Sequence, residues 1–209
     1  MSRTKIRFED KKQELLQSIW KILLKDGYEK MTIAVIMNEL GISKGAFYHY
    51  FQSKEDCVDQ AIRFYVQKSI QELEKHDRPE APPVMRLQKA IADGVFLFHE
   101  ETAENQFLHQ PENSIFHQKL MAVTVKMLAP YYAVIIKQGV LSNEFAVSSP
   151  LETAEMLLTL MNFYLNASIF QWEPADMAVK IHALEELANK ALGTREYVPL
   201  LDFETPKHL

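Results

Sequence analysis

Side chains that suit contact with nucleic acid are concentrated between residues 43 and 54. Lys44 could donate hydrogen bonds to the O6 and N7 acceptors of guanine in the DNA major groove. Gly45 and Ala46 beside it are small enough to let the backbone approach a duplex closely. Further polar groups could bind phosphate oxygens and so fix the register of a protein on DNA; they belong to Thr32, Ser43, Tyr48, His49, Tyr50 and Lys54. These residue types predict a surface that reads DNA.

The elements that must position these side chains can be inferred from apolar spacing and caps. An apolar face with helical spacing is formed by Ile33, Ile36, Met37 and Leu40. Thr32 stands where an N-cap belongs, and Gly41 follows as a helix-ending glycine. Ser43 and Ser53 are the next two N-caps, with Asp56 at capping-box spacing from Ser53. The pattern of helix, short turn and helix predicts a helix-turn-helix, whose second helix enters the major groove.

The order of residues in this region is more specific than the pattern alone. Residues 41–55 read GISKGAFYHYFQSKE. This run resembles the DNA-binding segment of the tetracycline-repressor (TetR) family of bacterial transcriptional regulators, and the resemblance extends from about Leu15 to Val58. The sequence departs from the family at Met37 and Leu40, where alanine is common, and at Cys57, where leucine is common. All three residues remain apolar.

Composition favours an all-α chain. The 209 residues are 47% hydrophobic and 24% charged, with only six glycines, and no alternating β-branched stretch stands out. The net charge of −5 would suit DNA poorly if it were spread evenly. However, residues 1–54 include 10 basic and 6 acidic residues, whereas residues 55–209 include 13 basic and 22 acidic residues. The acidic excess therefore lies away from the predicted DNA surface, where salt screens it.

The sequence predicts an N-terminal three-helix DNA-binding domain and a larger C-terminal helical domain. Their expected ranges are 1–54 for the first, 55–80 for a connecting helix and linker, and 81–209 for the second. A helix over about 9–25 should open the first domain. The preceding basic residues Arg3, Lys5 and Arg7 indicate either a frayed tail or an arm that reaches DNA. The connecting helix, about 54–75, is roughly 30 Å long, and the proline-rich run DRPEAPP follows it.

Further helices are expected at about 84–101, 114–141, 151–170 and 174–192, the last closed by Gly193. The helices over 151–170 and 174–192 are apolar on more than one side, which indicates a contact beyond their own core. We expect them to pair with their copies in a homodimer, and the family resemblance implies the same. Two-fold symmetry would place the recognition helices of the two subunits roughly 34–36 Å apart on a pseudo-palindromic operator. The tail over 194–209 is either a packed extension or disordered.

The resemblance also implies that residues 84–170 enclose a small-molecule pocket whose occupant tilts the connecting helix. Aromatic and methionine side chains there would suit an apolar or aromatic effector, although the same residues could equally form plain core. The candidates are Phe96, Phe98, His99, Phe107, Phe116, Met121, Met127, Tyr131, Phe163 and Tyr164, with Asn162 and Asn166 as polar groups that could orient a ligand.

Several functions find no support in the sequence. Cys57 is the only cysteine, so an intramolecular disulfide is excluded. His99, His109 and His117 lack the spacing of a helical metal-binding pair, and we expect no metal and no cofactor. Catalytic motifs such as G-x-S-x-G and HExxH are missing. The N-terminus lacks a secretory apolar region, and the apolar stretch 120–141 is interrupted by charge and proline, so we expect a cytoplasmic protein without a membrane span.

These observations predict a homodimeric transcriptional regulator, and in particular a repressor that a small molecule releases from DNA. One alternative remains open, a DNA-binding dimer that acts as an activator or responds to a protein partner. A helical enzyme in which the helix-turn-helix is incidental would need a convergent cluster of titratable residues, which the sequence lacks, so we expect no enzyme.

Overall fold

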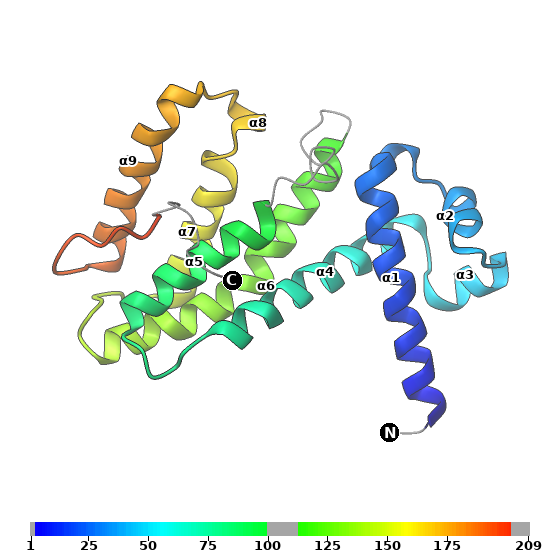
Figure 1. Cartoon of the computed structure of the whole chain (residues 1–209), viewed down its shortest axis with the longest axis horizontal. Helices are drawn as coiled ribbons and strands as arrows, with labels where there is room; N and C mark the ends of the chain where they lie inside the picture. Colours follow the sequence, from blue (N-terminus) through cyan, green and yellow to red (C-terminus); the bar gives the residue numbers. More distant parts are fainter. Residues whose placement is uncertain (1–2, 100–112, 202–209) are drawn as a thin grey trace. The chain divides into compact units, whose positions relative to one another are not determined.

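The computed structural model describes residues 3–99 and 113–201, and every regular element within them is helical (Figure 1). This confirms the predicted all-α class. The helices are α1 (Arg3–Lys30), α2 (Ile33–Leu40), α3 (Lys44–Tyr50), α4 (Lys54–His76), α5 (Pro83–His99), α6 (Ser114–Leu141), α7 (Pro150–Thr159), the π-helix η3 (Leu160–Tyr164), α8 (Ala167–Phe170) and α9 (Pro174–Leu192).

The helices form two compact units. The first holds the described residues up to Lys68 together with 113–123, and the second holds Ser69–99 and Thr124–201. The division therefore falls inside α4 and inside α6, so that each of these continuous helices contributes to both units. The predicted sequence divisions at residues 54 and 80 stay predictions.

Aromatic packing builds the core of the first unit. Trp20 of α1 stacks on Tyr65 of α4, with ring centroids 4.0 Å apart, and lies 5.6 Å from the ring of Phe116 in α6. Phe47 and Phe51 are buried as well and lie 5.5 Å apart. Large rings contribute strongly to burial, and here they fix α3 to the rest of the unit.

The first helix differs from the prediction at its start. It begins at Arg3 instead of Glu9, so the described part of the predicted frayed tail is helical. At its other end the helical backbone is interrupted at Gly27, with φ 76° and ψ 167°, where the sequence predicts the end of the helix. The missed start has a simple cause: residues 3–8 contain no helix breaker, and helix ends are the least certain feature of any sequence pattern.

The single helix predicted over 151–170 is wrong. α7 ends at Thr159, a π-helical turn follows, and the short α8 begins at Ala167. The Asn162 amide donates to the Leu158 carbonyl at 2.8 Å, which is the acceptor that its own backbone N–H would use in an α-helix. The Trp172 indole donates to the Tyr164 carbonyl at 2.8 Å. Side chains therefore replace the regular backbone ladder at this point.

In the second unit a buried polar network holds residues 194–201 against α9. The Asn189 side chain donates to the Val198 carbonyl and accepts from the Val198 N–H, each at 2.8 Å. Glu185 accepts from the Leu201 N–H and from the Tyr197 hydroxyl. This last hydrogen bond raises the pKa of Tyr197 to about 12. Of the two structures expected for the tail, the packed extension is correct as far as residue 201.

Among the described residues, α6 is long and apolar enough to cross a membrane by length and composition alone. The core helix of a soluble protein passes the same test. In α6, Phe116, Leu128, Tyr132 and Ile135 are buried inside the protein, and 39% of its most apolar window is buried.

Candidate nucleic-acid interface and ligand pocket

Three side-chain caps define the short helices of the first unit. The Thr32 hydroxyl accepts from the Val35 N–H, and the Ser43 hydroxyl accepts from the Ala46 N–H, both at 3.2 Å. Gly41 adopts φ 60° and ends α2, as the sequence predicts. Each cap satisfies a backbone donor that a helix start leaves open, worth about 1 kcal/mol. The turn between α2 and α3 is thus fixed by local hydrogen bonds.

The start of α4 has the third cap. The Asp56 N–H donates to the Ser53 hydroxyl at 3.1 Å, as the capping-box spacing predicts. The Asp56 carboxylate in return accepts from the Gln52 N–H at 2.8 Å, which lowers the pKa of Asp56. The neighbouring Cys57 is fully buried, and burial raises the pKa of its thiol to about 12. A protonated, buried thiol is unreactive.

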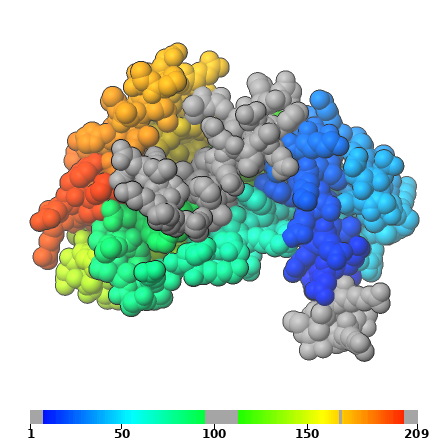
Figure 2. Space-filling model, viewed as in Figure 1, coloured from blue at the N-terminus to red at the C-terminus, as the bar shows by residue number. Residues whose placement is uncertain are grey.

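The outer face of α3 is open to solvent. Lys44, Gly45, Tyr48 and His49 are exposed, whereas Phe47 between them is buried and holds the helix in place. In the space-filling view, the light-blue atoms of α2 and α3 form an open surface of the first unit (Figure 2). Ser43 is also exposed and Ala46 is half-buried. The structure therefore brings this part of the predicted site together on one short helix.

Gly45 has no internal reason to be glycine. Among the described atoms, a Cβ at this position would meet only the Ser43 hydroxyl, at 4.0 Å. Its backbone is helical, and glycine in a helix costs roughly 0.5–1 kcal/mol relative to alanine. The described part of the chain therefore leaves room for a side chain here, and the predicted close approach of Gly45 to DNA stays a prediction.

Phe8 is a contributor that the sequence reasoning missed. Its ring stacks on Tyr50 with centroids 4.9 Å apart and meets the edge of His49 at 5.3 Å. Tyr50 is consequently half-buried, so part of its ring supports α3 from the side of α1. Phe8 stands some 40 residues before its partners in a stretch expected to be a tail, and no local pattern could have linked them.

Two other predicted phosphate contacts stand at the starts of the helices before and after α3. Thr32 is exposed at the start of α2. The Lys54 ammonium lies 4.1 Å from the centre of the Tyr28 ring, a cation–π contact. The Tyr28 hydroxyl donates to Glu55 at 3.4 Å, and burial, with the nearby Glu55 charge, raises the pKa of Tyr28. Tyr28 thus orients the Lys54 charge.

Of the predicted ligand-binding residues that the structure describes, some belong to the first unit and others to the second, and their role in binding stays a prediction. The side chains of Phe96, Phe98 and His99, and the whole of Phe107, lie outside the described residues. Phe116 is buried against Trp20 in the first unit, which also holds the half-buried Met121. In the second unit Met127 is half-buried, Asn162 bonds Leu158, Phe163 is exposed, Tyr164 lies beside Trp172 and Asn166 is buried.

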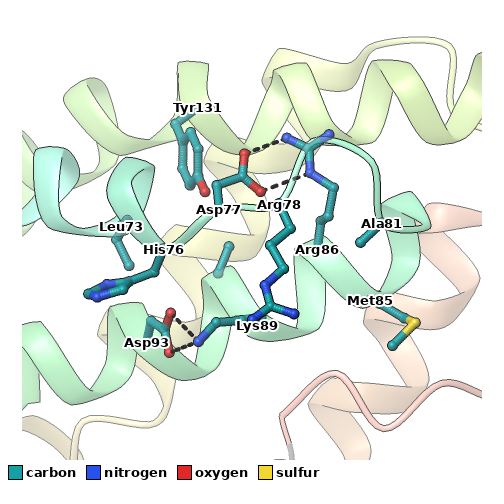
Figure 3. A pocket seen from close by; sticks show the side chains of 11 residues that line it. Leu73, His76, Asp77, Arg78, Ala81, Met85, Arg86, Lys89, Asp93 and Tyr131 are labelled. Carbon is teal, nitrogen blue, oxygen red and sulfur yellow. Dashed lines mark hydrogen bonds and ion pairs between the residues drawn. The ribbon is translucent and has the colours of Figure 1, made fainter. Parts of the chain in front are cut away.

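A pocket of about 430 Å³ lies in the second unit, at the end of α4 and the start of α5 (Figure 3). Among the predicted ligand-binding residues whose side chains the structure describes, only Tyr131 lines it. Two ion pairs mark its walls: Arg86 with Asp77, and Lys89 with Asp93 at 2.8 Å. The remaining lining residues are Leu73, His76, Arg78, Ala81, Met85 and Ala90. Sequence reasoning searched for aromatic and methionine stripes and so passed over this charged group.

Capped short helices around an exposed polar face define a helix-turn-helix protein of the DNA-binding class. A family profile described as bacterial regulatory proteins of the tetR family matches residues 12–61, and one described as the tetracyclin repressor-like C-terminal domain matches residues 98–187. The chain belongs to the TetR family of transcriptional regulators.

Curated relatives agree with this assignment. The chain is 26% identical over 174 residues to YerO of Bacillus subtilis, named as an uncharacterized HTH-type transcriptional regulator; the match covers 78% of this chain and 58% of that protein. The chain thus spans little more than half of that relative. It is 22% identical over 177 residues to the regulator YfiR of the same organism, covering 81% of this chain and 86% of YfiR.

Solved structures show the same fold. A TetR-family regulator from Pectobacterium atrosepticum aligns over 92% of this chain and 98% of its own, with a TM-score of 0.65 and 15% identity. A tetR-family regulator from Rhodococcus RHA1 aligns over 94% of this chain and 100% of its own, with a TM-score of 0.52 and 19% identity. At these identities the likeness concerns fold alone.

Proposed function

We propose that this protein is a cytoplasmic repressor that binds a pseudo-palindromic operator as a homodimer and leaves it when a small molecule binds. The observation that carries the DNA-binding part is the solvent-open face of α3, with Lys44 at its capped N-terminal end and Gly45 beside it. Lysine at this position suits guanine in the major groove, and the flanking hydroxyl and imidazole groups suit phosphate.

Release by a ligand requires that the ligand bind the DNA-incompetent arrangement more tightly than the competent one. The support for such coupling is the continuity of α4. This helix starts at Lys54, directly after the helix-turn-helix, and ends at His76, which lines the charged pocket. A helix transmits a displacement along its length without a flexible joint, so an occupant at its end can bias its direction.

Lys44→Ala is expected to weaken binding to the preferred DNA sequence by roughly 1–3 kcal/mol and to relax base choice at one position of each half-site. The measurement is selection from a random DNA pool, followed by titration of the selected site with wild type and variant. Lys25→Ala is the matched control, because Lys25 is an exposed lysine on α1. If the Lys44→Ala protein selected the same bases with the same stringency, Lys44 would not read DNA.

The homodimer is proposed to form through α7 and α9, which pack on each other in the second unit (Figure 1). Large apolar side chains remain exposed on this pair, namely Met156 on α7 and Val179 and Leu187 on α9, with Phe163 in the π-helical turn. Several exposed large apolar side chains on neighbouring helices are typical of an interface.

Leu187→Glu should raise the dissociation constant of the dimer at least about ten-fold, because each subunit would bury an unpaired carboxylate in the interface. Light scattering over a dilution series measures it. Leu141→Glu serves as the control, since Leu141 is even more exposed but lies at the end of α6. Equal behaviour of the two variants would place the interface elsewhere.

A further inference from the structure

We propose that the charged pocket at the end of α4 binds an organic anion with one carboxylate head and an apolar tail. This inference rests on the proposed function, because it gives the chemical class of the effector that the function requires. It also narrows the sequence expectation of an apolar or aromatic molecule, since the pocket is lined by charge as well as by apolar groups.

The charge balance of the pocket favours an anion. Three permanent cations line it, Arg78, Arg86 and Lys89, against two carboxylates, Asp77 and Asp93. One positive charge is therefore left over, and a single carboxylate would neutralise it. Arginine presents parallel donors that match the two oxygens of a carboxylate. A carboxylate head group would therefore match both the positive charge and the hydrogen-bond geometry of an arginine in this pocket.

The leftover cation can be assigned to a particular residue. The Arg86 side chain is buried and each of its three nitrogens makes a hydrogen bond: Nε donates to Asp77 at 2.9 Å, Nη2 donates to the other Asp77 oxygen, and Nη1 donates to Gln138 of α6. Lys89 bonds both oxygens of Asp93, at 2.8 and 3.0 Å. Arg78 is exposed and has no ion-pair partner among the described side chains.

Figure 3 shows the Arg78 side chain extending between the Asp77–Arg86 pair and the Lys89–Asp93 pair. Its backbone belongs to the linker that joins α4 to α5. A carboxylate held by Arg78 would therefore be bonded to the segment that follows α4 directly. That position lets occupancy bias the end of α4, while Asp77 and Arg86 keep the linker attached to α5.

The rest of the lining suits an apolar tail. Leu73 and Ala90 are buried at the floor, and Met85 is exposed at the edge with a flexible side chain. The Tyr131 ring is half-buried, and burial raises the pKa of its hydroxyl to about 12, so it remains a neutral hydrogen-bond donor. A volume of about 430 Å³ lies within the range of small-molecule sites.

The test compares three probes of equal length, octanoate, 1-octanol and octylammonium, by calorimetric titration of the full-length protein without DNA. Octanoate is expected to bind, with octanol weaker and octylammonium weakest. Arg78→Gln should weaken octanoate binding about ten-fold or more, through loss of a charge-assisted hydrogen bond. Asp93→Asn should do the opposite and tighten it about three-fold, because it removes a partly screened negative charge. Arg195→Gln, an exposed arginine in the tail, is the matched control.

The inference is overturned if octanoate and octanol bind equally, if no octanoate binds, or if Arg78→Gln and Arg195→Gln behave alike. Release of DNA is measured separately, with the sequence selected from the random pool. If an uncharged compound releases DNA from the wild type while octanoate neither binds the protein nor releases DNA, the proposed regulatory function holds and this pocket assignment fails. If octanoate binds through Arg78 and leaves the DNA affinity unchanged, the pocket assignment holds and release by this ligand fails.

Discussion

Replacing Arg86 with methionine is expected to lower the free energy of unfolding by about 3–5 kcal/mol, the usual cost of removing one partner of a buried ion pair. The Arg86 side chain is only 4% exposed and that of Asp77 only 12%. Without the guanidinium, the Asp77 carboxylate would stay buried without the partner that hydrogen-bonds both of its oxygens, and the linker after α4 would lose its attachment to α5. Urea denaturation of both proteins at neutral pH measures the difference.

Acid provides a second readout of the same pair. The hydrogen bond from Arg86 lowers the pKa of Asp77 in the folded state. A lowered carboxyl pKa stabilises the protein above the unfolded value of about 3.9, and this contribution is lost as the pH falls through the folded value. The difference in the free energy of unfolding between wild type and Arg86→Met should therefore be largest near neutral pH and should become smaller below about pH 4.

The double variant Asp77→Leu/Arg86→Met separates loss of the pair from loss of packing. Two apolar side chains of similar bulk leave no unpaired charge, and such replacements of buried pairs are often neutral. The double variant should therefore be clearly more stable than Arg86→Met alone. If it were less stable, the cost would lie in packing and not in the isolated carboxylate.

Much of the DNA-facing geometry could be predicted because it is fixed by local chemistry. Ser43 and Thr32 cap helices whose backbone donors lie three residues ahead, and Gly41 ends a helix through its own φ angle. Such interactions depend on residues within one turn of each other, so spacing in the sequence is sufficient. The exposure of Lys44 follows once Phe47 and Phe51 are recognised as the buried face of α3.

The misses have the opposite cause. The contact between Phe8 and Tyr50 joins distant parts of the chain, and nothing near Phe8 signals it. The α-helix ends after Thr159 because the Asn162 side chain, and not the Asn162 backbone N–H, donates to the Leu158 carbonyl. The spacing of apolar residues carries no information about such a hydrogen bond. Arg86 is a charged residue that burial scales place outside, and only its pairing with Asp77 across the proline-rich linker lets it lie inside.

Gly27→Ala is the second change expected to have a large effect, a loss of about 3 kcal/mol or more in the free energy of unfolding. Gly27 has φ 76° and ψ 167°, a region almost exclusive to glycine that costs other residues about 1–3 kcal/mol. An added Cβ would also stand 2.3 Å from the Asn113 side-chain oxygen, far inside contact distance. That oxygen accepts from the Tyr28 N–H at 3.1 Å, and Asn113 is buried. Loss of this hydrogen bond would lower the free energy of unfolding by a further amount of about 1–3 kcal/mol.

Gly41→Ala isolates the backbone part of this cost, because Gly41 also has a positive φ of 60° but a Cβ added there would meet no described atom within 4 Å. It should lose only about 1 kcal/mol. Thermal or urea denaturation of the two variants side by side gives the comparison. Tyr28 also carries the Lys54 contact, at 4.1 Å, so Gly27→Ala should weaken DNA binding as well, although it lies outside α3. If the two variants lost the same free energy of unfolding, the Asn113 side chain would move aside at little cost. The contact of Gly27 and Tyr28 with Asn113 would then not support the DNA-binding helices.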